Sequence, residues 1–559
     1  MPYRLFATLL SGALAVVAFS QTPSSVNPVS TGKTEVNLDV ASPLLPFVVV
    51  QFRVNTDPVL FANLNGLRPA HAFKSRSDKW VLAAPSVKAA TEIARRLSKD
   101  GTLASVYQDR IVPLQRYWAP NDPYYNYNNP QGHPGQWHLR NTANIGGANI
   151  DARVWGAWQR DITGQGVTIG ICDDSFQTTH PDLAPGYSAA DSYDFGQLDG
   201  NPDPVAGSDV HGISVAGVAG GRGGNGIGIT GAAPLATLAG LRLPFSGGVS
   251  ASAWEDALLY RSSGAIRTIQ IKNHSYGVPA PYYRSDVEVA ALESSIAAGT
   301  IHVWAAGNSR GGPGEDANKA ATQSVPGQVV VAALGETGVY SYYSSFGADV
   351  AVTAPSSSDT IGITTTDRMG SGGYNGHADS DYTTGFGGTS SASPLVAGVM
   401  ALVKQVQPAL DGRMAKHLLA ISSDVVDAGD YTVSSDSGWR TNAAGIRFNQ
   451  NYGFGLVNAD RLTANAVNYK GVTPLVTEDT GKVNVAAAIP EMNYTGITRK
   501  FTINRNVPIE EMVITLGLTH TATGDIRVYL TSPSGYRCRL LLNNPYDGSD
   551  IDGEWRAYT

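Results

Sequence analysis

The sequence predicts a parallel α/β sheet with helices on both faces, preceded by a small α/β unit and followed by a β-sandwich. Between about residues 117 and 470, short apolar runs alternate with helical patterns, which is typical of a parallel sheet. Several of these runs end in polar residues, and open α/β sheets place their functional sites beyond such strand ends. Beyond residue 470 the pattern changes to short alternating strands separated by turn signals, which favours an all-β sandwich.

Composition narrows the function classes. The 559 residues are 42% apolar and 16% charged, as in a globular protein of about two to four units. The formal net charge of −7 gives no electrostatic basis for binding nucleic acid, so no such partner is expected. Cys172 and Cys538 fall in different predicted units, and we interpret both as packed thiols rather than as a disulfide.

Residues 1–20 have the pattern of a signal peptide. Arg4 supplies a positive start, Leu5 to Phe19 are mostly apolar, and Ala18 and Ser20 place small residues before a cleavage point. Because a bilayer span needs about twenty apolar residues, cleavage is favoured over a membrane anchor. We therefore expect a secreted protein, extracellular or periplasmic, without a stable membrane anchor.

Residues 21–116 have the pattern of a small separate α/β unit. The predicted elements are a strand, a capped helix and a second strand, at residues 47–54, 86–99 and 105–107. The dibasic pair Arg95-Arg96 falls inside the predicted helix, where a protease reaches the backbone poorly. Processing closer to Gln115-Arg116, in an exposed linker, is the better prediction.

The central domain, residues 117–470, contains three apolar runs that lead into polar segments. Residues 167–172 lead to Asp173-Asp174, residues 268–271 lead to Asn273–Gly277, and residues 301–306 lead to Gly307-Asn308. A helix is predicted at 285–298, with Ser285 as its N-cap. If the three runs are parallel strands, their polar ends meet at one edge of the sheet.

Ser390 is the candidate nucleophile. It lies in the segment Gly387–Pro394, directly before an apolar run whose members recur at helical spacing: Leu395, Val399, Leu402 and Val406. We expect Pro394 in the first turn of that helix and Ser390 at its N-terminus, where free N–H groups favour developing negative charge. A Gly/Ser loop that merely caps a helix is the alternative interpretation, and the choice depends on whether a base can reach Ser390.

A base and an acid are available upstream. His211 is followed by small residues at close spacing, as in a helix packed tightly against a sheet, and Asp173 and Asp174 follow a predicted strand. A serine hydroxyl becomes nucleophilic when an imidazole takes its proton and a carboxylate fixes the tautomer of that imidazole. The residues alone leave open which of the two aspartates serves.

The segment Gly388–Pro394, GTSSASP, resembles the nucleophile motif of the subtilisin-like serine proteases, and the preceding Gly387 points to the kexin-like branch. The segment around His211 resembles the family's histidine motif, although the two positions after Gly212 depart from it. In the family, the catalytic aspartate stands seven residues before the histidine of His-Pro-Asp-Leu, here His180, which selects Asp173. The order Asp173, His211, Ser390 is that of subtilisin.

The resemblance implies further site residues. The Asn308 side chain, with the backbone N–H of Ser390, would form the oxyanion hole. The stretch Ser275-Tyr276-Gly277 would pair with the substrate backbone, and Asp209 would lie beside the P2 side chain. We interpret three other histidines as scaffold: His138, His180 and His274.

The resemblance also implies a calcium site. Calcium takes six to eight oxygen ligands, which separate loops can supply. One carboxylate would come from Asn121-Asp122-Pro123, one from His180-Pro181-Asp182, and the remaining ligands from a Gly-rich loop. The implied ligands are Asp122, Asp182, the Asn225 side chain and the carbonyl groups of Arg222, Ile227 and Ile229.

Residues 471–559 resemble the first part of the P domain of the proprotein convertases. The resemblance rests on Thr519–Thr521 and on Gly524–Gly535, and it implies a jelly-roll β-sandwich. The predicted strands lie at 499–503, 512–516 and 526–530. We expect the module to be incomplete in this sequence.

Taken together, the resemblance implies a secreted, calcium-dependent serine endopeptidase that is made as a zymogen and hydrolyses polypeptides. Residues 21–116 would act as an intramolecular inhibitor, and the enzyme would be a monomer. Two alternatives stay open: a catalytically silent scaffold that binds partners or works at the cell surface, and a transpeptidase in which an amine attacks the acyl-enzyme.

The substrate pocket is predicted to prefer an apolar or uncharged P1 residue. Convertases bind a basic P1 side chain through acids that follow the substrate strand, and Val278–Pro281 contains none. Lys319 would add a like charge close to the same pocket, and Asp316, Glu255 and Asp256 are the acids that would compensate. A buried cation without a partner is costly, so a basic P1 residue is disfavoured.

Overall fold

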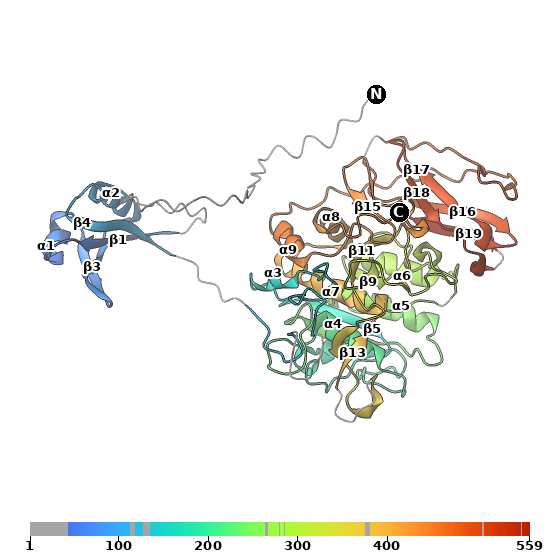
Figure 1. The fold of residues 1–559 in the computed structure, drawn as a ribbon, viewed down its shortest axis with the longest axis horizontal. Coiled ribbons are helices and arrows are strands. Elements are labelled where there is room, and N and C mark those ends of the chain that lie inside the picture. The colour runs from blue at the N-terminus through green and yellow to red at the C-terminus, as the bar shows by residue number, and fades with distance from the viewer. Residues whose placement is uncertain are drawn as a thin grey trace. The chain divides into compact units, whose positions relative to one another are not determined.

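The computed structural model describes residues 43–111, 118–126, 135–262, 266–278, 280–283, 286–374, 381–505, 508–548 and 551–559 (Figure 1). The chain divides into two compact units, Met1–Arg116 and Tyr117–Thr559. The predicted signal peptide and the predicted processing site near Gln115-Arg116 lie outside the described residues. None of the helices in the described ranges is both long enough and apolar enough to span a membrane.

The first unit is a four-stranded antiparallel sheet with two helices. Its strand order is β2-β3-β1-β4, and the elements are β1 Leu44–Phe52, α1 Pro58–Leu64, β2 Arg68–Phe73, β3 Arg76–Ala83, α2 Val87–Leu97 and β4 Leu103–Arg110. Alternate residues of β1, including Val48 and Val50, join Ala90 and Leu97 of α2 in one apolar core. Ser86 caps α2, and Arg95-Arg96 lies in its last turn, inside the helix as predicted.

The second unit is built on a seven-stranded parallel sheet with the order β11-β10-β9-β8-β5-β7-β6. The strands are β5 Thr168–Asp173, β6 Tyr193–Asp194, β7 Thr237–Arg242, β8 Ile271–His274, β9 Ile301–Ala305, β10 Val329–Leu334 and β11 Val350–Pro355. Strands β7 and β6 lie on one side of β5, and the next strand in the chain, β8, pairs with its other side. The carboxyl ends of β5 and β8 therefore form the switch point where such sheets place their sites.

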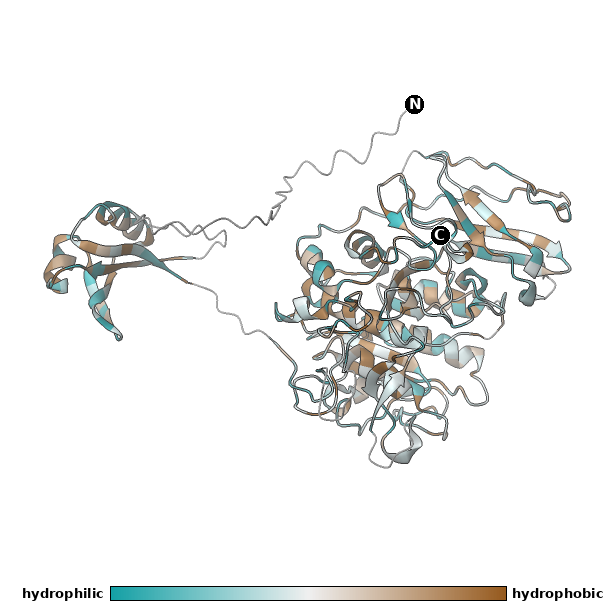
Figure 2. Ribbon diagram, in the orientation of Figure 1, coloured by the Kyte–Doolittle hydropathy of each residue, from teal (hydrophilic) through white to brown (hydrophobic). Residues whose placement is uncertain are grey.

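Helices cover both faces of this sheet, as the sequence predicts. They are α3 Val154–Trp158, α4 His211–Gly220, α5 Ala251–Leu259, α6 Asp286–Ala297, α7 Thr389–Val406, α8 Gly412–Ser422 and α9 Ala459–Val467. Neighbouring strand residues face opposite cores: Ile171 and Val303 pack with α4 and α7, whereas Cys172 and Trp304 pack with α5 and α6. Apolar residues accordingly concentrate in the central strands and in α7 (Figure 2).

Helix α7 begins earlier than predicted. It starts at Thr389, so Pro394 is its sixth residue and not part of the first turn. Pro394 has no N–H to donate to the carbonyl oxygen of Ser390 four residues earlier. The Ser275 hydroxyl donates to that oxygen instead, at 3.0 Å, which allows the helix to extend across the proline.

The remaining strands form small antiparallel pairs. They are β12 Ile363–Thr366 with β13 Tyr382–Phe386, β14 Arg440–Thr441 with β15 Arg447–Phe448, β16 Val513–His520 with β19 Ile551–Tyr558, and β17 Val528–Thr531 with β18 Arg537–Leu541. The prediction of a strand at 499–503 is wrong, because this segment has no strand partner among the described residues. Phe501 is exposed there, so the alternating pattern has no core face to bury.

Candidate functional site

The site lies where strands β5, β8 and β9 end. Asp173 is the last residue of β5, Ser275 follows β8, and Asn308 lies three residues beyond the end of β9. His211 is the first residue of α4, and Ser390 is the second residue of α7. Two helix N-termini and three strand ends thus supply the five polar residues.

Asp173 and His211 are directly hydrogen-bonded. Nδ1 of His211 donates to Oδ1 of Asp173 at 2.8 Å, and the aspartate side chain is fully buried, whereas the imidazole is 24% exposed. Burial lowers the pKa of His211, but the Asp173 carboxylate, with a further contribution from Asp174, outweighs that effect and raises the pKa overall. An imidazole held in this way can accept a proton at Nε2 and is stabilised once charged.

Asp174 binds the N-terminus of α4 and not the imidazole, a role that the sequence does not reveal. Its carboxylate accepts the backbone N–H groups of Val210 at 3.2 Å, His211 at 3.1 Å and Gly212 at 2.8 Å. These are the free donors at the start of α4, so Asp174 caps that helix from a distance. A Cβ at Gly212 would lie 2.1 Å from the carbonyl oxygen of Ser175, so only glycine fits there. Asp173 therefore binds the imidazole, and Asp174 binds the helix that carries it.

Ser390 is 9% exposed, and its hydroxyl donates to the carbonyl oxygen of Ser275 at 3.2 Å. No hydrogen bond between Ser390 and His211 is present in the described structure. The imidazole packs edge-on against Phe386, with ring centroids 5.5 Å apart. In substrate-free enzymes the bond between nucleophile and base is often loose and tightens only in the complex.

Asn308 is oriented by the start of α7. Its Oδ1 accepts the backbone N–H of Thr389 at 2.8 Å and the hydroxyl of the same residue at 2.9 Å. The described residues offer no acceptor for Nδ2, so that group remains as a donor beside Ser390. Gly388 has a φ of +73°, and a Cβ there would lie 2.9 Å from Nδ2, so glycine keeps the donor accessible. An oxyanion hole requires a donor oriented in advance in this manner.

The predicted substrate strand has an open backbone. Among the described residues, none hydrogen-bonds to the backbone N–H or C=O groups of Tyr276 or Gly277, as pairing with an extended peptide requires. The Tyr276 side chain points into the protein, where its hydroxyl meets Trp254 Nε1 and His274 Nδ1, each at 3.0 Å. His274 is thus engaged with Tyr276 and lies within the scaffold.

Asp209 is already paired. It is 1% exposed, and Arg242 donates to it at 2.7 Å while also contacting Asp194 at 3.0 Å. Because the Arg242 guanidinium compensates its charge, this geometry does not favour the expected role of Asp209 beside a basic P2 side chain.

A small pocket adjoins the substrate strand. It is lined by Trp254, Val278, Ala280, Tyr283, Glu288, Ala320, Ala321 and Thr322. Glu288, within the helix predicted at 285–298, is 1% exposed, and its Oε2 has no hydrogen-bond partner among the described residues. The expectation that Lys319 adds positive charge to the pocket is wrong, because Lys319 is buried in an ion pair with Asp547.

The loops expected to bind calcium come together. Asp122 accepts the backbone N–H groups of Gly224 at 2.8 Å and Asn225 at 3.2 Å, and Asp182 accepts Asn225 Nδ2 and the N–H of Ile229, both at 2.8 Å. Both carboxylates are buried, and burial raises the pKa of both, that of Asp182 to about 6. Three glycines of the loop have positive φ, at positions 224, 226 and 228.

This donor set fits a calcium ion. The carbonyl oxygens of Arg222, Ile227 and Ile229 accept no hydrogen bond from the described residues, so they are available as ligands. The described residues contain no group of three or more His, Cys, Asp or Glu side chains placed to hold a metal, so this site would rely on carbonyl groups. The Asn225 amide directs its nitrogen at Asp182, and coordination through its oxygen requires that amide to turn over.

Comparison with known proteins identifies the family. Residues 164–455 match the model of the subtilase family, and residues 509–558 match that of the proprotein convertase P-domain. The extracellular serine protease of Aeromonas sobria is 31% identical over 486 residues, which cover 75% of this chain and 77% of the relative. Its crystal structure superposes with a TM-score of 0.62 at 27% identity, covering 76% of this chain and 87% of that one.

The chain belongs to the subtilase family of serine proteases. Within that family its relatives include endoproteases of the kexin and proprotein convertase type. One of them, the PC3-like endoprotease variant B of Hydra vulgaris, is 28% identical over 481 residues. The match covers 81% of this chain but only 63% of the length of that relative. We call residues 509–558 the P-domain segment.

The coupling between Asp173 and His211 can be tested directly. In the Asp173→Ala variant the pKa of His211 should fall, because the counter-charge and the hydrogen-bond acceptor are lost while the desolvation of this partly exposed ring, which lowers its pKa, remains. The measurement is an NMR titration of the His211 ring protons, with Ser390→Ala as a control that keeps the wild-type value. A His211 pKa unchanged by Asp173→Ala would contradict the described geometry.

Proposed function

We propose that this chain is a secreted, calcium-dependent serine endopeptidase that hydrolyses peptide bonds of polypeptide substrates. The observation that carries the proposal is the conjunction at the start of α7. There Ser390 follows Thr389, which binds Oδ1 of Asn308 and leaves its Nδ2 as a donor, and an imidazole oriented by a buried carboxylate is anchored on the neighbouring helix α4.

The geometry supports a two-stage mechanism. The Ser390 hydroxyl leaves the Ser275 carbonyl, transfers its proton to Nε2 of His211 and attacks the substrate carbonyl carbon. Asp173 keeps Nδ1 protonated and stabilises the imidazolium. His211 then protonates the leaving amine, and the acyl group remains on Ser390. A water molecule, deprotonated by the same imidazole, releases the acid and restores the serine.

Charge on the tetrahedral intermediate is met by donors already in place. Nδ2 of Asn308 and the backbone N–H of Ser390 at the α7 terminus would donate to the oxyanion. Loss of one such donor costs about 2.7–4 kcal/mol of barrier height in enzymes of this kind. The open backbone of Tyr276 and Gly277 would align the peptide.

Calcium and zymogen formation complete the proposal. Asp122, Asp182, Asn225 and three carbonyl groups would hold the ion, whose positive charge would offset the two buried carboxylates and tie three loops together. Residues 21–116 would serve as an inhibitor until cleavage near Gln115-Arg116 releases them. The crystal structure of the Aeromonas sobria protease with a separate chaperone shows that a relative associates with an accessory protein.

Removal of the nucleophile or the base should abolish turnover without unfolding the protein. Ser390→Ala and His211→Ala should each lower kcat on a cleaved peptide by at least ~10³-fold, because the members of such a triad act as a unit. Circular dichroism and melting temperature check the fold. Both variants should also accumulate as the unprocessed chain, and normal maturation of purified Ser390→Ala would refute self-processing.

Chelation should destabilise the protein. A ligand that binds only the folded state raises its stability by mass action, so EDTA should lower the melting temperature and added calcium should restore it. Asp182→Ala should remove most of this sensitivity, with Asp359→Ala, at an exposed acid outside the three loops, as the matched control. A wild-type melting temperature indifferent to EDTA and calcium would show that the site is misassigned.

Cleavage specificity should favour apolar or uncharged P1 residues, since Val278 and Ala280 supply no charge to the pocket. Profiling on a peptide library decides this. Near-exclusive cleavage after Arg or Lys would overturn the assignment and direct attention to Glu288, the one acid that lines the described part of the pocket.

A further inference from the structure

One loop separates the substrate pocket from the P-domain segment. It runs from Gly312 to Gln323 and includes the short 3₁₀ turn η4, Ala317–Lys319. Three residues near its end, Ala320 to Thr322, line this pocket together with Val278. Gln323 Nε2 then donates to the carbonyl oxygen of Ala305 at 3.3 Å, in the segment that leads to Asn308. The loop is therefore part of the wall beside the substrate strand.

Strand β19 of the P-domain segment binds the centre of this loop. The Asn318 amide donates to the carbonyl oxygen of Tyr558 at 2.9 Å and accepts the backbone N–H of the same residue at 3.0 Å. The indole Nε1 of Trp555 donates to the carbonyl oxygen of Asn318 at 2.9 Å. Asn318 is fully buried, so all three bonds are shielded from water.

A buried ion pair holds the same loop from the segment before β19. Lys319 is 1% exposed and pairs with Asp547, which is fully buried and also accepts the backbone N–H of Gly314 at 2.8 Å. The backbone N–H of Leu542 donates to Asp316 at 2.8 Å. Buried charges of this kind require a close fit, because a displaced partner leaves an uncompensated charge.

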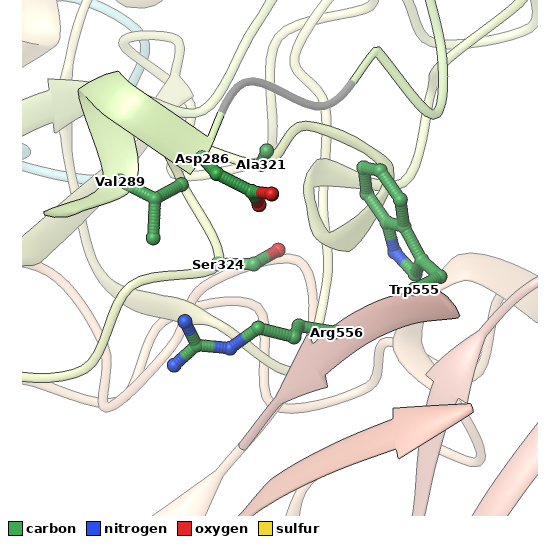
Figure 3. Close-up of a pocket in the computed structure, with 6 residues that line it drawn as sticks. All are labelled: Asp286, Val289, Ala321, Ser324, Trp555 and Arg556. Atoms are coloured by element: carbon green, nitrogen blue, oxygen red, sulfur yellow. The ribbon is translucent and has the colours of Figure 1, made fainter. Parts of the chain in front are cut away.

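Figure 3 shows the far side of the loop. Ala321 and Ser324 lie between Asp286 and Val289 of α6 and Trp555 and Arg556 of β19, around a second small pocket. Ala321 lines both pockets, so the loop is a thin wall with the substrate strand on one side and β19 on the other. A shift of β19 would move the wall of the substrate pocket.

We propose that the P-domain segment positions this loop for substrate binding, with Asp547 and Trp555 as positioning residues that act through Lys319 and Asn318. The inference rests on the proposed protease function and identifies the contacts that hold the wall of the substrate pocket in place. Without these bonds the loop samples other arrangements. The apparent affinity for peptide then falls in proportion to the fraction of molecules with the wall in place. The Ser390 hydroxyl and the Asp173–His211 pair do not take part in these loop contacts.

Two variants test it. Asp547→Asn removes the charge that pairs with Lys319, and Trp555→Phe removes one hydrogen bond to Asn318 while keeping an aromatic ring. We expect KM for a cleaved peptide to rise about tenfold in the first and about threefold in the second. The kcat for a small nitrophenyl ester, which does not fill the pocket, should stay within about twofold in both.

The matched control breaks another contact of the C-terminal region. Glu510 pairs with Arg413 of α8 at 2.6 Å, away from the loop, so Glu510→Gln should lower the melting temperature without raising KM. Unchanged KM in both test variants, or an equal rise in Glu510→Gln, would overturn the proposal. If Asp547→Asn does not fold, Trp555→Phe decides.

The affinity for a non-cleavable peptide analogue, measured calorimetrically on the processed proteins with Ser390 intact, tests loop positioning separately from hydrolysis. Weaker binding in Trp555→Phe than in the wild type supports loop positioning whether or not the chain hydrolyses peptides. Equal binding contradicts it, even in a chain whose wild type proves to be an active protease.

Discussion

The N-terminus of helix α7 is the constraint on which the site depends. Asn308 caps it through Thr389, and the Ser275 hydroxyl replaces the hydrogen bond that Pro394 cannot make to the Ser390 carbonyl. These two contacts tie the helix to the ends of β9 and β8. The same contacts place the Ser390 hydroxyl, expose the Asn308 amide and leave the adjoining backbone of the substrate strand unpaired. The hydrogen bonds that stabilise this part of the fold are therefore the ones that position the groups of the proposed mechanism.

A second constraint is the pair of adjacent acids after β5. Asp173 faces His211, whereas Asp174 satisfies the free N–H groups at the start of α4, the helix that carries that histidine. One strand end therefore orients both the ring and its helix. The imidazole is thus oriented by Asp173 although it is partly exposed, and its neighbour Gly212 has no room for a side chain.

Much of the architecture is predictable from the sequence, since buried parallel strands are continuous apolar runs bounded by polar residues, as at 167–172 and 301–306. The triad candidates lie in local motifs, so they too can be identified without coordinates. The α7 start was misplaced because the bond from Ser275 to Ser390 spans 115 positions, and no local rule contains it. The Lys319–Asp547 and Asp209–Arg242 pairs escaped prediction for the same reason. The strand expected at 499–503 had the right alternation but no partner.

The central claim is that Ser390 is a nucleophile activated by His211, and labelling with a fluorophosphonate probe tests it most directly. Intact-mass analysis of the processed wild-type protein should show one adduct, and peptide mapping should locate it on Ser390. Ser390→Ala should show none, and His211→Ala should react far more slowly. A processed, folded wild-type protein that acquires no adduct, or one that is labelled equally well as Ser390→Ala, would contradict the account.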